Sequence, residues 1–156
     1  MTLPQRRIAL PLAIGGLAGA GSTISGYLTY VHAAGAPLIC GGHSSCVTVQ
    51  SSEYASIGGV PVALVGLVFY LTIMALAFVL PARPMALLAV FGLSLGGALY
   101  SVYLTWVEVA VLEAICMWCV ASAAVVGLLA IVSGTAALRA PDAPVRSQHV
   151  RQGTLG

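Results

Sequence analysis

The chain carries, at residues 114–138, the stretch AICMWCVASAAVVGLLAIVSGTAAL, which contains no charged side chain and has two cysteines near its start. A membrane-spanning helix needs about 20 apolar residues, so this stretch is long enough to cross a bilayer. Cys116 and Cys119 are three apart and would share one face of a helix. Near a helix N-terminus, free N–H groups and the helix dipole favour a thiolate, the nucleophile of thiol–disulfide exchange. The pair is therefore either redox-active or inert and buried.

Composition indicates a membrane protein. Of the 156 residues, 60% are hydrophobic and only 6% are charged, whereas about 25% of the residues of soluble domains are charged. The mean hydropathy is +1.03. The net charge of +2 comes without a Lys/Arg cluster or an aromatic platform, which argues against nucleic-acid binding.

Three further apolar runs are long enough to cross a bilayer, at residues 8–31, 60–80 and 85–107. We therefore predict an all-α, polytopic membrane protein, a bundle of four transmembrane helices. Its membrane domain would cover residues 8–138, between a short N-terminus at 1–7 and a polar tail at 139–156. The tail has no periodic apolar face, so we expect it to be disordered.

Two features of these runs carry further expectations. Gly15-x-x-x-Gly19 and Gly92-x-x-x-Gly96 predict smooth faces for close helix packing. An alternative for the first run is a cleaved secretory signal, with the cleavage site near residues 34–36. The run is longer than the apolar core of such signals, which is about 7–15 residues.

The longest segment between spans is residues 32–59, which is rich in Gly and Ser and contains Cys40 and Cys46. We expect a loop first and then a short helix over residues 46–57 at the membrane interface. Four spans place both termini and the tight turn at residues 81–84 on one side. All six basic residues fall on that side: Arg6, Arg7, Arg83, Arg139, Arg146 and Arg151. Positive residues stay in the cytoplasm, so we predict cytoplasmic termini.

This topology puts all four cysteines on the outer face, in a compartment that permits disulfides. Cys40 and Cys46 lie in the first outer loop, and Cys116 and Cys119 at the outer end of the last span. Two close pairs on one face can pass a disulfide between them. The alternatives are two static disulfides that brace the loop, or a four-cysteine zinc site.

The combined pattern resembles the vitamin K epoxide reductase family, and more narrowly its bacterial, disulfide-forming homologues. The motifs are Cys40-x5-Cys46, then Ser52, then GVPVALVGLVFY at residues 59–70, then Cys116-Met117-Trp118-Cys119. The resemblance covers about residues 8–138 and implies a four-helix membrane enzyme that oxidises thiols and reduces a quinone, either ubiquinone or menaquinone.

The resemblance also implies a role for each cysteine. Cys116 and Cys119 correspond to the active-site pair beside the quinone, with Cys119 facing the ring and Cys116 exchanging with the loop. Cys46 corresponds to the inner shuttle cysteine that meets Cys116. Cys40 corresponds to the outer one, which receives electrons from a thioredoxin-like or DsbA-like extracytoplasmic partner. We expect that partner to be a separate polypeptide, and we expect the chain itself to lie in a bacterial inner membrane.

Three further residues are candidates for quinone binding. Ser52 matches a family hydroxyl position, and a hydrogen bond to a quinone carbonyl strengthens as the ring gains charge. Alternatively Ser52 caps a helix or is an ordinary loop serine. Phe69 and Tyr70 are candidates to line the pocket, although such side chains also serve plain helix packing.

Two departures from the family pattern argue against epoxide reduction. Val62 stands where the animal enzymes have an asparagine that contacts vitamin K, and Ala123 stands where they have a tyrosine. Simple quinone reduction is therefore the favoured reaction, with epoxide reduction and a non-enzymatic protein with structural disulfides as alternatives. His43, between the loop cysteines, and Glu53, beside Ser52, are either participants in proton transfer or ordinary surface groups.

Overall fold

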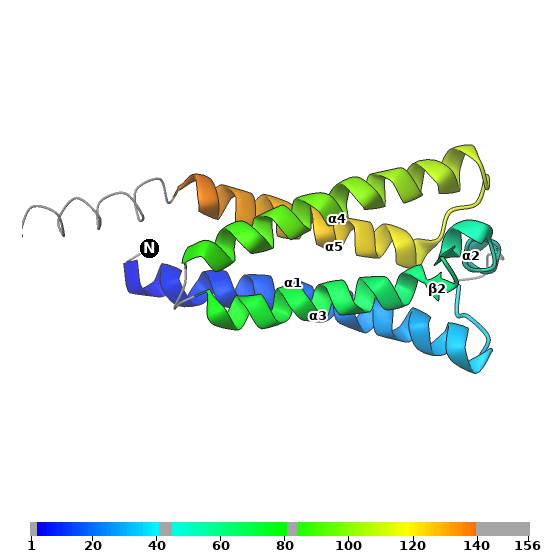
Figure 1. Cartoon of the computed structure of the whole chain (residues 1–156), viewed down its shortest axis with the longest axis horizontal. Helices are drawn as coiled ribbons and strands as arrows, with labels where there is room; N and C mark the ends of the chain where they lie inside the picture. The colour runs from blue at the N-terminus through cyan, green and yellow to red at the C-terminus, as the bar shows by residue number, and fades with distance from the viewer. Residues whose placement is uncertain (1–2, 41–44, 81–83, 140–156) are drawn as a thin grey trace, which may run out of the picture.

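The computed structural model describes residues 3–40, 45–80 and 84–139, and these residues form a helical bundle (Figure 1). The elements are α1 (Leu3–Ala34), α2 (Ser45–Gln50), the short 3₁₀ helix η1 (Glu53–Ala55), β1 (Ser56–Ile57), β2 (Val60–Pro61), α3 (Val62–Val79), α4 (Pro84–Ala110) and α5 (Met117–Leu138). The four long helices α1, α3, α4 and α5 are long and apolar enough to cross a membrane. The prediction of an all-α bundle with four spans is therefore confirmed.

The long helices run up and down, and their ends gather at two poles. α1 packs most extensively along α3, and α4 along α5, with a further contact between α1 and α5. One pole holds the start of α1, the end of α3, the start of α4 and the end of α5 (Figure 1). The other pole holds α2, β1, β2 and the start of α5, and we call it the cysteine end.

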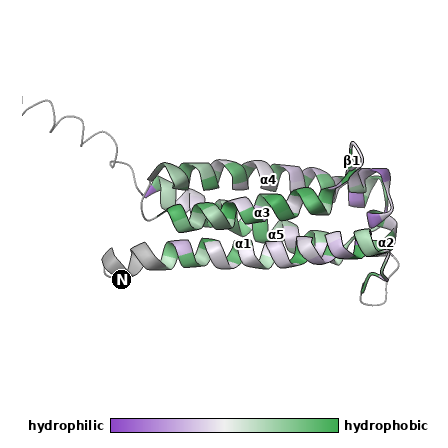
Figure 2. Cartoon of the chain, turned by 60° about the horizontal axis from the view of Figure 1, so that its bottom comes forward, coloured by the Kyte–Doolittle hydropathy of each residue, from purple (hydrophilic) through white to green (hydrophobic). Residues whose placement is uncertain are grey.

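The outside of the bundle is apolar, as a lipid-facing surface must be. Phe78 of α3, Val102 of α4 and Ile131 of α5 have exposed fractions of 80%, 68% and 62%. Figure 2 shows mostly hydrophobic or neutral residues along the spans, with hydrophilic residues near β1 and α2 at the cysteine end. Because lipid offers no hydrogen bonds, only backbones that satisfy themselves, such as these helices, can span it. The chain is a multi-pass membrane protein.

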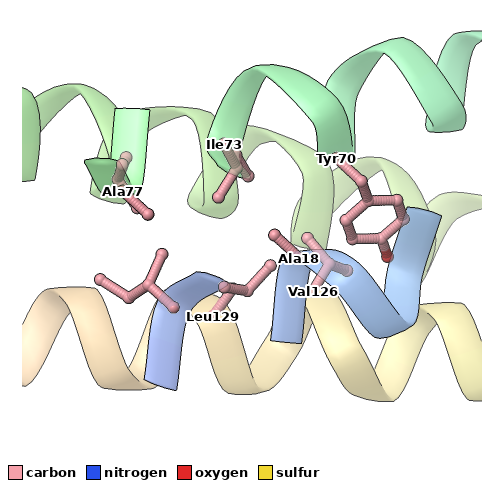
Figure 3. Packing of buried hydrophobic residues seen from close by; sticks show 8 residues of the cluster. Ala18, Tyr70, Ile73, Ala77, Val126 and Leu129 are labelled. Carbon is pink, nitrogen blue, oxygen red and sulfur yellow. The ribbon is translucent and has the colours of Figure 1, made fainter. Parts of the chain in front are cut away.

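The buried core joins all four long helices (Figure 3). Its members are Ile14 and Ala18 from α1, Tyr70, Ile73 and Ala77 from α3, Val90 from α4, and Val126 and Leu129 from α5. Ile14 and Ala18 are fully buried. This packing makes α1 part of the bundle and argues against the alternative of a cleaved signal.

The glycine motifs chosen from the sequence are not the glycines at close contacts. A Cβ atom added to Gly15, Gly19, Gly92 or Gly96 would meet nothing within 4 Å in the structure. That expectation was therefore wrong for packing within this chain.

Three other glycines allow close helix packing. A Cβ on Gly97 would lie 2.7 Å from the Phe69 ring, and one on Gly134 would lie 2.8 Å from the Phe91 ring. Gly21 faces the Tyr70 ring even more closely. Large rings, rather than facing backbones, fill the space that these glycines leave.

The segment after α2 also differs from the prediction. The expected helix over residues 46–57 ends at Gln50, and a small hairpin follows in which Ile57 pairs with Val60. Gly58 and Gly59 form its turn with φ of 58° and 84°, the left-handed region that type I′ turns require. The hairpin leads directly into α3. Residues 81–83 of the turn predicted at 81–84, His43, and residues 140–156 of the tail lie outside the described residues.

Candidate functional site

The four cysteines meet at the cysteine end of the bundle. Cys46 and Cys116 are buried, with exposed fractions of 2% and 0%, and belong to one cluster with Val49 and Ala114. Cys40 and Cys119 are half-buried and pack against that cluster. The structure therefore brings the loop pair and the helix pair together, as thiol exchange between them requires.

The pair in the C-x-x-C motif straddles the start of α5. The sequence placed both cysteines inside a helix that began at residue 114, but α5 begins at Met117 and Cys116 is its N-cap residue, with φ −93° and ψ 114°. The backbone N–H groups of Trp118 and Cys119 lower the pKa of the Cys116 thiol, although its sulfur makes no capping hydrogen bond at this helix start. The dipole and free N–H groups of this helix end act on Cys116 directly.

The two buried cysteines have opposite electrostatic surroundings. A hydrogen bond from the Cys119 side chain, helped by the N–H groups of Cys119 and Trp118, lowers the pKa of Cys116 to about 6. Burial, together with the neighbouring Cys40 thiol, raises the pKa of Cys46. In the reduced protein, Cys116 is therefore mostly thiolate at neutral pH, while Cys46 keeps its proton.

The loop that carries Cys40 is fixed just before that cysteine. The Ile39 N–H donates to the Tyr27 hydroxyl at 3.1 Å, and the Trp118 indole N–H donates to the Ile39 carbonyl at 2.9 Å. The Tyr27 and Trp118 rings lie against each other, with centroids 5.0 Å apart. Tyr27 of α1 and Trp118 of the C-x-x-C segment thus hold the backbone N–H and C=O of Ile39. These two bonds anchor the loop directly before Cys40.

A cavity of about 200 Å³ opens beside Cys119 among α1, α3, α4 and α5. Its walls are mainly apolar. The lining includes every residue that the sequence suggested for the quinone, namely Ser52, Phe69 and Tyr70, together with Cys119. Residues from four separate segments of the chain therefore meet at one cavity.

The polar groups of this wall have defined partners. The Ser52 hydroxyl donates to the Val49 carbonyl at 2.7 Å, and it makes no capping hydrogen bond at η1. The Ser52 side chain therefore does not cap the start of η1; its hydrogen bond goes to a carbonyl in the last turn of α2. The Tyr70 hydroxyl donates to the Ser122 carbonyl at 2.9 Å, and its ring packs edge-on against Phe69. Tyr70 thus belongs both to the core and to the cavity wall.

Sequence reasoning missed two side chains of the site. Gln50 directs its amide toward the Cys119 sulfur, with 3.9 Å between Nε2 and Sγ. The apolar run predicted as the third span ended at residue 107, but α4 continues to Ala110 and buries Glu108 to an exposed fraction of 4%. Its Oε2 accepts the Cys116 N–H at 2.9 Å. An acidic residue directly after a long apolar run was the sequence signal that could have identified Glu108.

The other residues considered from sequence stand apart from this arrangement. Glu53 is exposed in η1. Across the three described ranges, no group of three or more His, Cys, Asp or Glu side chains is arranged to hold a metal ion. Val62 lines the cavity without offering a hydrogen-bond donor, whereas Ala123 is not among the lining residues.

Comparison with known proteins gives one family. A model of the vitamin K epoxide reductase family matches residues 12–133, from the first half of α1 to the last turns of α5. The matched region includes all four cysteines and every residue named above as lining the cavity.

Proposed function

The chain belongs to the vitamin K epoxide reductase family, and from this premise we propose that it is a quinone-dependent thiol oxidase that supports disulfide formation. Members of this family are membrane oxidoreductases that use quinones or vitamin K as electron carriers, generally with a thioredoxin-like partner. The proposed cycle oxidises a separate thioredoxin-like or DsbA-like protein outside the cytoplasm. The electrons go to ubiquinone or menaquinone in the membrane.

The observation that carries this proposal is the position of Cys119. Its sulfur belongs to the cluster of four cysteines and also lines the apolar cavity. Thiol exchange on one side of this residue is thereby connected to an apolar cavity between the long helices on the other. A pair of purely structural disulfides would need no such cavity at one of its sulfurs.

The pKa values give the exchange a direction. In a mixed disulfide between Cys46 and Cys116, attack by Cys40 on Cys46 would release Cys116. Thiols of low pKa leave faster, and the pKa of Cys116 is about 6. The competing attack by Cys119 on Cys116 would release Cys46, whose pKa is raised. The asymmetry favours a re-formed Cys40–Cys46 disulfide and electrons on the Cys116–Cys119 pair.

The cavity suits an apolar ring with a carbonyl at one edge. Phe69, Tyr70 and Val62 form apolar walls, and Ser52 is a hydroxyl whose donor can turn from the Val49 carbonyl toward a ligand. When bound, a quinone supplies a two-electron, two-proton acceptor. Because Val62 lacks the amide of the animal enzymes, the wall favours simple quinone reduction over epoxide reduction.

The proposed orientation follows the arginines. Arg6 and Arg7 lie in the first turns of α1, and Arg139 caps α5, at the pole opposite the cysteine end. Glu108 and Glu113 lie toward the cysteine end. We place the arginine pole in the cytoplasm and the cysteines outside, in a bacterial inner membrane.

The experiment for this function uses the protein in lipid nanodiscs with a short-tailed ubiquinone or menaquinone. A reduced thioredoxin-like protein should lose its thiols in proportion to the quinol formed, and the reaction should stop when quinone is left out. Disulfides that resist the reduced protein and produce no quinol would instead indicate a structural, non-enzymatic role.

Ser52→Ala tests the hydroxyl at the cavity. We expect the KM for quinone to rise about 2- to 10-fold, because a net hydrogen bond is worth about 0.5–1.5 kcal/mol. The rate of exchange between the cysteine pairs should stay unchanged. Steady-state quinone reduction and thiol trapping measure the two.

The matched control is Ser51→Ala, which removes an exposed hydroxyl bonded to the Thr48 carbonyl at 3.3 Å. It should leave the KM unchanged. If Ser52→Ala lowers the melting temperature and spares the KM, then Ser52 only ties η1 to α2.

A further inference from the structure

Glu108 is a buried acidic side chain in a membrane bundle. It lies in α4 near the cysteine end, with an exposed fraction of 4%. Burying an ionisable group away from water costs several kcal/mol unless its contacts compensate, so such groups in membrane proteins usually have a function. Its contacts should therefore show what the carboxyl group does.

One set of contacts holds the link between α4 and α5. The Glu108 side chain accepts the Cys116 N–H at 2.9 Å, and its backbone carbonyl accepts the Ala114 N–H at 3.0 Å. These bonds position Cys116 at the start of α5. An amide oxygen could accept the same N–H, so this role alone does not require an acid.

A second set of contacts does require an explanation. The Glu108 carboxyl group lies within hydrogen-bonding reach of the Cys119 thiol. Glu108 and Cys119 both line the cavity. The carboxyl group thus lies beside both the C-x-x-C pair and the space in which electrons would leave it.

The proton balance of the reaction, which rests on the proposed function, gives this position a use. When the thiols of Cys116 and Cys119 form a disulfide, two electrons and two protons leave them. The pKa of about 6 means that Cys116 has already released its proton to water at neutral pH. The remaining proton is on Cys119, in an apolar site, and needs an acceptor before the S–S bond can close.

We propose that Glu108 is a catalytic proton relay between Cys119 and the cavity. Its carboxylate takes the proton of the Cys119 thiol while the sulfur pair loses two electrons to the bound quinone and the S–S bond forms. The carboxylic acid then gives this proton to the reduced quinone, and a second proton enters from water. Glu108 ends as the carboxylate with which it began.

Glu108→Gln tests the relay because glutamine keeps an acceptor for the Cys116 N–H but cannot carry the proton. In a single turnover, the pre-reduced variant should reduce a short-tailed quinone about 100-fold more slowly than wild type, the lower range for loss of a general acid–base group. Reduction of its Cys116–Cys119 disulfide by dithiothreitol should change less than about twofold, since that step does not use the relay. Glu113→Gln, at an exposed carboxylate in the same link, should match wild type in both assays.

A second readout needs no quinone. Thiolate absorbance of the reduced protein, minus that of its Cys116→Ser variant, should rise through a midpoint near pH 6. Among the described residues, the titratable groups that act on Cys116 are Cys119, Cys46 and Glu108, and the charge of Glu108 raises the pKa of Cys116. The Glu108→Gln variant should therefore have at least as large a fraction of Cys116 thiolate at neutral pH as wild type, and yet reduce quinone more slowly. Added formate should restore part of the rate in Glu108→Ala.

Three results would overturn the relay. The first is an unchanged rate of quinone reduction in Glu108→Gln. The second is an equal slowing of quinone reduction and of the reduction of its disulfide by dithiothreitol, and the third is a higher midpoint pH for the Cys116 thiolate in this variant. Each result would leave Glu108 with a positioning role only. A wild-type protein that forms no quinol would overturn the proposed function itself. That result is recognisable because the control Glu113→Gln would then be inactive too.

Discussion

Cys119→Ala is expected to abolish quinone reduction and, when Cys40 is replaced by alanine as well, to accumulate a disulfide between Cys46 and Cys116. Cys119 is the cysteine that lines the cavity, so its loss should disconnect the sulfur cluster from the electron acceptor. Cys40 and Cys119 are the two sulfurs of the cluster that could attack a Cys46–Cys116 disulfide, so the double variant keeps neither of them to resolve it. Mass spectrometry of non-reduced peptides identifies the cross-link, and quinone absorbance gives the rate.

Cys40→Ala is the matched control. It removes a half-buried cysteine of the same cluster that does not line the cavity. After chemical reduction, this variant should still reduce quinone in one turnover, while failing to turn over with a thioredoxin-like partner. A Cys119→Ala protein that keeps more than about a tenth of the wild-type rate would contradict the assignment of Cys119, because loss of a reacting group typically costs far more.

The bundle and the meeting of the cysteines were predictable because both depend on coarse properties of the chain. Long uncharged runs determine where the spans lie, since a bilayer excludes charge. Once four spans are counted, alternation alone puts the loop that carries Cys46 and the start of the last span at the same pole. No side-chain detail enters that argument.

The details that were missed depend on contacts between residues far apart in sequence. The hairpin is a local exception: Gly58 and Gly59 looked like loop residues, and the pairing of Ile57 with Val60 and the positive φ values of the two glycines show the turn. Glu108 looked like a residue just outside the third span, because the continuation of α4 to Ala110 cannot be read from the apolar residues that follow residue 107. Hydropathy reports the cost of placing a group in lipid, but it does not report the partner that compensates that cost.

The glycines show the same limit. Spacing four apart marks a smooth helix face, but it does not say which ring lies opposite. Gly21 belongs to neither of the two glycine motifs chosen from the sequence. It nevertheless faces the ring of Tyr70, a residue with an exposed fraction of only 2%.

Gly21→Ala is therefore expected to be the most damaging single methyl addition among the described glycines of α1. The new Cβ would overlap the Tyr70 ring. That ring cannot swing away freely, because its hydroxyl is held at 2.9 Å by both the carbonyl and the side chain of Ser122. Overpacking of this kind costs about 1–3 kcal/mol. The melting temperature in detergent micelles should fall, and the KM for quinone should rise because Tyr70 also lines the cavity.

Gly19→Ala provides the control, because a Cβ there meets nothing within 4 Å. Alanine is favoured over glycine inside a helix by about 1 kcal/mol, so this variant should be as stable as wild type or more so. A double-mutant cycle of Gly21→Ala with Tyr70→Ala then isolates the overlap, since contacting residues couple by about 0.5–3 kcal/mol. If Gly21→Ala lowers the stability of wild type and of the Tyr70→Ala variant by the same amount, then the new methyl group does not overlap the Tyr70 ring. That result would contradict the close packing of α1 against Tyr70 at the cavity wall.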